Sequence, residues 1–285
     1  MAGPTRPPVA LVRMSESSPS GKPPAPSRAT ALPVYLSGDV HLGAVSRERE
    51  RAFLRWLEHA GRHASEIVLT GDLFDFWFEY QSVIPRGHTR VLGALASLID
   101  AGIPVTLTGG NHDWWGGSYF EEELGVKFLR GPAVLQLAGR RVFLAHGDGL
   151  GRGDRGYRAL RFMLRSPVAC WVFRWVHPDL GMRLARHVSK TERRGPTGGE
   201  NERAVALAEW GTRKLRSDPS LDLVVLGHTH EPTLTEVERG RWYVNAGDWV
   251  AHRTYLVLEE GTAPRLVEWE LSADQAGPGA APPSP

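Results

Sequence analysis

Short apolar segments alternate with longer amphipathic segments along most of this chain, and this alternation constrains its fold most strongly. The apolar segments have the length of buried strands and lie at residues 33–37, 66–70, 103–107 and 221–226. The amphipathic segments have helical periodicity and lie at residues 48–60, 89–101 and 204–215. A hairpin is predicted around Gly139, and a run of further strands is predicted after residue 226. Strands that alternate with helices predict an α/β fold.

The two ends of the chain differ in composition from its middle. Residues 1–30 and 273–285 are rich in proline, serine, glycine and alanine, so they bury too little apolar surface to offset the entropy of ordering. We expect two disordered tails around one domain at residues 31–272. Cys170 is the single cysteine, which excludes an intramolecular disulfide and a cysteine-rich zinc site. The sequence has neither an apolar run of about 20 residues nor the apolar core of a secretory signal; we expect a cytoplasmic protein.

Polar residues with metal-binding side chains come directly after five predicted strands. These residues are Asp39, His41, Asp72, Asn111, His112, Asp113, His146, His228 and His230. In open α/β sheets, ligands bind at the carboxyl ends of the strands. Each residue alone is more often part of a turn or an ordinary surface position, but five strand ends of this kind predict one convergent site.

The residue types indicate the chemistry of that site. Carboxylate oxygen, amide oxygen and imidazole nitrogen suit Mn, Fe or Zn. In an extended segment, the pairs Asp39/His41 and His228/His230 each place both side chains on one face. One carboxylate can bridge two cations about 3.5–4 Å apart, an arrangement that serves displacement at phosphorus. The sequence therefore predicts a metal site suited to phosphoryl chemistry.

The order of these motifs resembles the calcineurin-like metallophosphoesterases, whose pattern is D-x-H, G-D, G-N-H-[DE], a His before Gly, and G-H-x-H. The resemblance implies a sandwich of two sheets flanked by helices, and two divalent cations, most plausibly Mn²⁺. The ligands it implies for one cation are Asp39, His41, Asp72 and His230. The ligands it implies for the other are Asp72, Asn111, His146 and His228. It also implies that His112 stabilises or protonates the leaving oxygen and that Asp113 orients the His112 imidazole.

Two longer motifs resemble a narrower family, the UDP-2,3-diacylglucosamine hydrolases of lipid A biosynthesis. Residues 71–77 are similar to its G-D-L-F-E-x-W, and residues 146–157 to its H-G-D-x-L…D-x-x-Y. This resemblance implies cleavage of the pyrophosphate bond of the UDP-sugar lipid, giving UMP and 2,3-diacylglucosamine 1-phosphate. The candidate substrate contacts are Asp154, Tyr157 and Arg161. The best-known members carry Arg in place of His112. The alternative to the UDP-sugar lipid is therefore another substrate, a phosphomonoester, a phosphodiester or a nucleotide. A non-catalytic binding module is disfavoured because every ligand position is filled.

A basic insertion, residues 152–200, is predicted to form a helical lid. Between residues 152 and 194, eleven basic and three acidic residues give a net charge of +8 in a chain whose total is +2. Arg158, Arg161 and Arg165 share one helical face, and aromatic residues follow them. Arginines bind phosphate, and basic helices with aromatic residues suit an anionic membrane surface. We expect a ligand-binding lid and peripheral contact with the inner face of the cell membrane, with a solvated arginine face as the alternative; the acidic remainder of the chain argues against nucleic acid.

Overall fold

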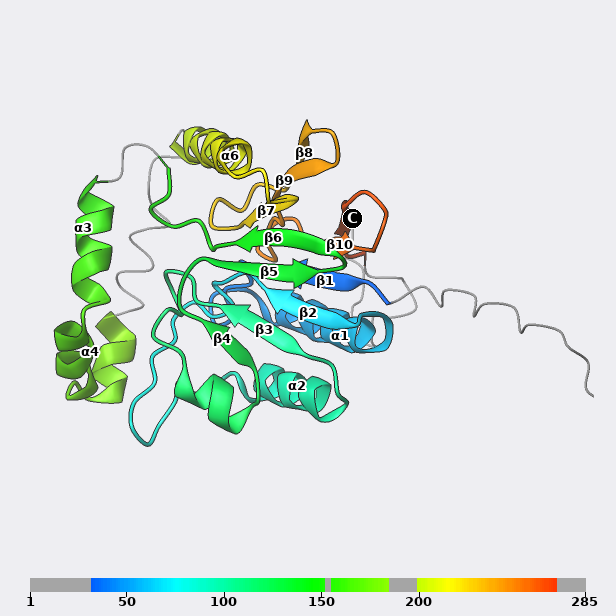
Figure 1. The fold of residues 1–285 in the computed structure, drawn as a ribbon. Helices are drawn as coiled ribbons and strands as arrows, with labels where there is room; N and C mark the ends of the chain where they lie inside the picture. Colours follow the sequence, from blue (N-terminus) through cyan, green and yellow to red (C-terminus); the bar gives the residue numbers. More distant parts are fainter. Residues whose placement is uncertain (1–31, 152–154, 185–198, 271–285) are drawn as a thin grey trace, which may run out of the picture. The chain divides into compact units, whose positions relative to one another are not determined.

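Two β-sheets pack face to face in the computed structural model, which describes residues 32–151, 155–184 and 199–270 (Figure 1). In spatial order, the strands of the first sheet are β11 (Arg265–Glu268), β10 (Thr254–Leu258), β1 (Val34–Ser37), β2 (Glu66–Leu69), β3 (Val105–Thr108) and β4 (Lys127–Leu129). Those of the second are β5 (Ala133–Leu137), β6 (Arg140–Leu144), β7 (Leu223–Leu226), β9 (Arg241–Asn245) and β8 (Thr233–Glu238). Both sheets are parallel at their centres and have antiparallel strands at the β10–β11, β5 and β8 edges. The predicted α/β class and the two-sheet sandwich are confirmed.

Alternation along each strand divides the interior into layers. In β1, Val34 and Leu36 pack between the sheets, whereas Tyr35 faces the helices outside the first sheet. In β7, Val225 packs between the sheets and Val224 faces a helix outside the second. Successive side chains of a strand point to opposite faces of the sheet. A strand that is buried on both faces is therefore apolar throughout, and its sequence does not alternate between apolar and polar residues.

Helices cover the outer faces of both sheets. α1 (Arg47–His63) and α2 (Thr89–Asp100) lie against the first sheet, and α6 (Gly199–Ser217) lies against the second (Figure 1). α1 begins where the Ser46 hydroxyl accepts a hydrogen bond from the Arg49 amide at 3.3 Å, a typical N-cap. Its buried face includes Phe53, Trp56 and Leu57. All three helices agree with the segments predicted from periodicity.

The insertion that is predicted to form a lid lies, in its described parts, at the carboxyl end of β3 and β6 (Figure 1). Its described parts are α3 (Arg155–Leu164), α4 (Pro167–Arg174) and a helical segment at residues 178–184 (Figure 1). A π-helix at Tyr119–Glu123, labelled η1, and the short strand β4 are additional elements that the sequence pattern did not predict. The predicted tails, residues 1–30 and 273–285, lie outside the described residues, as do residues 152–154 and 185–198 of the lid.

Candidate metal centre

The loops that follow β1, β2, β3, β6 and β7 are bonded to one another at the carboxyl edge of the sheets. The Asp39 amide donates to the Gly71 carbonyl at 3.0 Å, and the His41 amide donates to the Asp72 carbonyl at 3.0 Å. The His112 amide donates to Asp72 Oδ1 at 2.9 Å. Parallel strands end at the same edge of a sheet, and these hydrogen bonds hold their loops in one cluster, as the sequence predicts.

Backbone strain is concentrated in these loops. Of the non-glycine residues in the described parts of the chain, seven have positive φ, and five of them are Asp39, His41, Asp72, His228 and His230, with φ between 50° and 70°. Such conformations are uncommon outside glycine and persist where the surrounding structure requires them. Glycines allow the close approach of the loops, since a Cβ at Gly227 would lie only 2.6 Å from Asp39 Oδ2.

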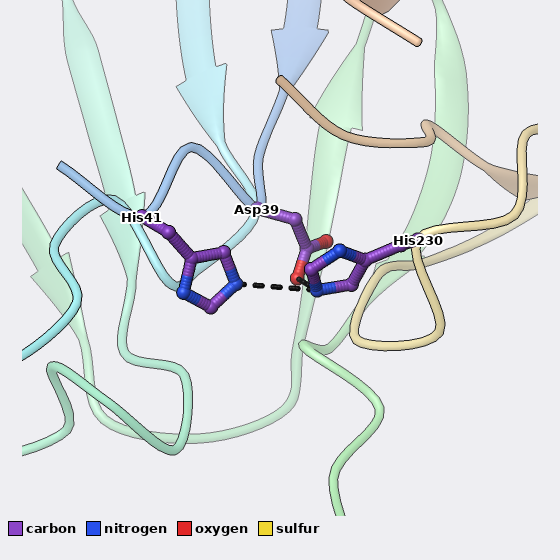
Figure 2. A group of neighbouring side chains, drawn as sticks. All are labelled: Asp39, His41 and His230. Atoms are coloured by element: carbon purple, nitrogen blue, oxygen red, sulfur yellow. Dashed lines mark hydrogen bonds and ion pairs between the residues drawn. The ribbon is translucent and has the colours of Figure 1, made fainter. Parts of the chain in front are cut away.

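One group of side chains consists of Asp39, His41 and His230. His41 Nε2 lies 3.2 Å from His230 Nε2, and His230 Nε2 lies 3.5 Å from Asp39 Oδ1. Figure 2 shows both imidazoles turned toward the same space beside the carboxylate. The ligand atoms of this group lie within 4.8 Å of one another, which is close enough to bind one metal ion.

A second group consists of Asp72, His146 and His228, whose ligand atoms also lie within 4.8 Å of one another. His146 Nε2 lies 3.2 Å from Asp72 Oδ2 and 3.1 Å from the side-chain oxygen of Asn111. His146 Nδ1 lies 3.1 Å from the Thr70 carbonyl, so Nδ1 donates its proton there and Nε2 is the nitrogen that faces the cluster. Asn111, which follows a predicted strand, therefore lies in contact with this group.

The two groups are adjacent through Asp72. Its Oδ2 is 3.2 Å from His146 Nε2 in the second group and 3.9 Å from His41 Nε2 in the first. Carboxylate oxygens and imidazole nitrogens converge here, and the outer nitrogens of His146 and His230 are already hydrogen-bonded, to the Thr70 carbonyl and the Asp248 carboxylate. This donor set fits divalent cations, and a single shared carboxylate suits a pair of them.

The electrostatics of the cluster couple its acids and bases. Burial would raise the pKa of Asp72, but the imidazoles of His146 and His112 bring it well below its ordinary value. Burial would lower the pKa of His146, but Asp72 raises it to about 10. Burial, together with the charge of His146, lowers the pKa of His228 to about 3. A cation bound here would replace the proton that Asp72 retains on His146, because a ligating imidazole must be deprotonated.

The predicted partnership between Asp113 and His112 is wrong. His112 Nδ1 donates instead to the backbone carbonyl of Asp75 at 2.7 Å. The fully buried Asp113 carboxylate accepts hydrogen bonds from backbone amides, at 2.7 Å from Gly110 and 2.7 Å from Leu73. It therefore fastens the loop after β2 to the loop after β3. The family resemblance implied the other role, but the chain turns at residues 111–114 and the two side chains have different partners.

Two buried carboxylates near the cluster were not among the predicted site residues. Asp248 Oδ2 lies 3.0 Å from His230 Nδ1, and Asp148 Oδ2 accepts hydrogen bonds from Arg161 at 3.0 Å and Arg165 at 2.9 Å. Both follow a glycine after a strand, at Gly147 and Gly247. The same strand–Gly–Asp signal that identified Asp72 could have found them.

The arginines of the lid differ in their contacts. Arg161 and Arg165 turn toward Asp148, and Arg165 also donates to the Gly110 carbonyl at 3.1 Å, whereas Arg158 is exposed. The Tyr157 hydroxyl lies 3.4 Å from Asp148 Oδ2. The predicted residue Asp154 lies outside the described residues. Two of the three predicted substrate contacts therefore lie next to the cluster, bonded to Asp148.

A mainly apolar cavity of about 180 Å³ lies between the cluster and the lid. Its lining includes Asn111, His112, Phe76, Trp115, Leu164 and Phe173. Phe173 of α4 packs on Phe78 with ring centroids 4.6 Å apart. The cavity places apolar surface directly beside the polar cluster.

Comparison with known proteins agrees with this geometry. The model of the calcineurin-like phosphoesterase family matches residues 32–232. The chain belongs to the calcineurin-like phosphoesterase family. This calcineurin-like phosphoesterase is 32% identical over 248 residues to the UDP-2,3-diacylglucosamine hydrolase of Porphyromonas gingivalis, with 80% of this chain and 95% of that protein covered. It is also 32% identical over 231 residues to the UDP-2,3-diacylglucosamine hydrolase of Pseudomonas entomophila, with 80% and 95% covered.

Among the described residues, every helix is too short or too polar to span a membrane.

Proposed function

We propose that this protein hydrolyses the pyrophosphate bond of UDP-2,3-diacylglucosamine, giving UMP and 2,3-diacylglucosamine 1-phosphate. The observation that carries the proposal is the pair of ligand groups that are adjacent through Asp72 and lie beside an apolar cavity. In the reaction, the oxygen of water bonds to the α-phosphorus, and the bridging oxygen leaves with the lipid phosphate. Relatives that bear this enzyme's name and match over 80% of the chain support the choice of substrate.

Two divalent cations, proposed to be Mn²⁺, would bind the cluster. The proposed ligands are Asp39, His41, Asp72 and His230 for one cation and Asp72, Asn111, His146 and His228 for the other. When bound, the cations supply an activated water and positive charge beside the phosphoryl oxygens. The buried carboxylates of Asp39 and Asp72 would balance part of that positive charge.

His112 is proposed to act on the leaving or phosphoryl oxygen. Its Nδ1 donates to the Asp75 carbonyl at 2.7 Å, which fixes the plane of the ring. Its Nε2 side then faces Asp72 Oδ2 at 3.9 Å, and the ring lines the cavity. In its protonated form, the imidazole donates from Nε2 to a developing oxygen charge, a contribution that general acids and fixed donors make in the transition state.

The lid is proposed to bind the remainder of the substrate. Arg161, Tyr157 and Asp154 are the proposed polar contacts; the first two lie beside Asp148 at the edge of the cavity. Arginine forks suit the diphosphate. The apolar lining contributed by Leu164 and Phe173 suits acyl chains. A phosphomonoester without acyl chains would leave this lining unused, which favours the lipid over the alternative substrates.

The outer surface of the lid is proposed to contact an anionic membrane. The most exposed apolar side chains there are Phe162 (82%), Trp175 (77%), Val168 (71%) and Trp171 (60%). Exposed arginines, including Arg158 and Arg174, lie on the same helices. Aromatic and aliphatic side chains enter the headgroup region while basic side chains pair with lipid phosphates. We expect the double variant Trp171→Ser/Trp175→Ser to sediment less with anionic vesicles than the wild type does. The same variant should keep its metal content.

The proposed reaction is tested by UMP release from the acylated UDP-sugar in the presence of Mn²⁺. Asp72→Ala should reduce turnover by at least 10³-fold, roughly the scale of losing the electrostatic stabilisation of a transition state. Asp179→Ala, an exposed acid of the lid, is the matched control. A panel with p-nitrophenyl phosphate, bis-p-nitrophenyl phosphate and UDP-glucose measures selectivity. Equal kcat/KM for the lipid and these simple esters would reject the substrate, and full activity of Asp72→Ala would reject the dimetal site.

A further inference from the structure

The loop between β9 and β10 contains a buried carboxylate, Asp248, whose two oxygens both accept hydrogen bonds. Oδ2 lies 3.0 Å from His230 Nδ1. Oδ1 accepts from the Ala251 amide at 3.1 Å, the His252 amide at 2.9 Å and His252 Nδ1 at 3.1 Å. The residue is 2% exposed. A buried carboxylate with this many donors is held in a single orientation.

This contact determines which nitrogen of His230 faces the cluster. A carboxylate only accepts, so His230 Nδ1 carries the proton that it donates to Asp248. In the neutral imidazole, Nε2 is then the nitrogen with the lone pair, and it faces Asp39 Oδ1, 3.5 Å away, and His41 Nε2, 3.2 Å away (Figure 2). The backbone of His230 is left-handed, with φ of 59°, a conformation that persists where the surrounding structure supports it.

The same loop also supports Asp39. The Trp249 amide donates to the Asp39 carbonyl at 3.1 Å, and the Trp249 indole donates to Ser37 Oγ at 2.7 Å. Trp249 is fully buried against Phe53 and Trp56 of α1. Two of the three members of the first ligand group are therefore attached to residues 248–249. In the second group, by contrast, His146 Nδ1 is held by a neutral acceptor, the Thr70 carbonyl.

We propose that Asp248 is a positioning residue for one of the two cations, the one assigned to Asp39, His41, Asp72 and His230. It acts through His230 by fixing Nε2 as the ligand atom. The inference rests on the proposed dimetal site and assigns the loop at residues 248–252 to one half of it. Acceptors on the outer nitrogen of a ligating imidazole fix its tautomer and ring orientation, and their loss weakens metal affinity by about 10- to 100-fold.

The role requires a carboxylate rather than an amide. In Asp248→Asn, the side chain keeps its shape but has one accepting oxygen in place of two. If that oxygen faces His230, the NH₂ group faces the amides of Ala251 and His252. If it faces those amides, the NH₂ group faces His230 Nδ1–H and favours the opposite tautomer. His252→Ala is the matched control, because it removes a neighbour of Asp248 and leaves the contact with His230.

The experiment measures Mn²⁺ stoichiometry and affinity by calorimetry and by metal analysis after dialysis, together with the EPR spectrum of bound Mn²⁺. We expect the wild type and His252→Ala to bind two ions as a coupled pair. We expect Asp248→Asn to bind one ion at wild-type affinity and the other about 10- to 100-fold more weakly, with the spectrum of an isolated ion. In a His230→Ala background, Asp248→Asn should change affinity little further, since both changes affect one interaction.

Each alternative outcome is distinguishable. Two ions bound at wild-type affinity by Asp248→Asn, or equal weakening of both ions, would overturn the positioning role. Failure of the wild type to bind two ions would instead overturn the proposed dimetal site. If Asp248→Asn does not fold, the tautomer of His230 is measured in the metal-free wild type by ¹⁵N NMR of the imidazole. Protonation at Nδ1 supports the inference, and protonation at Nε2 alone overturns it.

Discussion

Replacing Asp113 with alanine distinguishes two roles for this residue, which are fastening two loops through their backbone amides and orienting the His112 imidazole. Its carboxylate accepts from the Gly110 and Leu73 amides at 2.7 Å, and from the Asp72 and Phe74 amides at 3.3 and 3.4 Å. All four donors belong to buried residues. Asp113→Ala removes the acceptor of these four donors at a fully buried position. The loops carrying Asp72 and Asn111 then lose these links and keep only bonds such as that of the His112 amide to Asp72 Oδ1.

The magnitude follows from the two short hydrogen bonds. A buried donor without a partner destabilises by about 1–3 kcal/mol, so two such donors give roughly 2–6 kcal/mol. Removing the charge offsets part of this loss, because burial and the nearby charge of Asp72 raise the pKa of Asp113 to about 6. We expect a net loss of about 2–4 kcal/mol in the free energy of unfolding, which is a large share of the stability of a typical domain.

Urea unfolding of the metal-free protein measures this loss. The midpoint for Asp113→Ala should fall with little change in slope, and Mn²⁺ affinity should fall as well. His112→Ala is the comparison, because it removes the imidazole without touching the four amides. It should lower turnover and leave the free energy of unfolding within about 1 kcal/mol of wild type. Wild-type stability of Asp113→Ala combined with reduced turnover would refute the backbone-fastening role and restore the pairing of Asp113 with His112.

Two further measurements test other parts of the site. In the metal-free protein, burial would lower the pKa of His146, but the charge of Asp72 raises it to about 10. A metal ion must therefore displace a proton from His146, and Mn²⁺ affinity should rise as the pH increases from about 6 to 9. An affinity that does not change with pH would contradict this. Arg165→Met removes a largely buried ion pair with Asp148, an interaction that contributes about 1.5–3 kcal/mol. It should therefore accelerate proteolysis of the lid by roughly tenfold or more. Arg158→Met, at an exposed position, is the control, and equal rates for both variants would contradict a lid held by Asp148.

The sequence predicted most of the strands and the residues of the cluster for local reasons. Apolar runs identify buried strands because both faces of each central strand are covered, as Val34 and Tyr35 show in β1. Polar residues directly after such strands occupy the carboxyl edge of the sheet whatever the details of packing. Asp39, Asp72 and His146 could therefore be assigned to one cluster from their positions alone.

The partners of these side chains depended on the tertiary structure. His112 bonds to the carbonyl of Asp75, 37 residues away, and His230 bonds to Asp248, 18 residues away. Arg165 bonds to Asp148 across the boundary of the lid. Chain geometry determines which way a strand residue points, whereas a loop side chain bonds to whichever donors or acceptors neighbouring loops bring near it. For this reason the sequence alone identified the residues of the cluster, and only the assembled loops decided how each one is held.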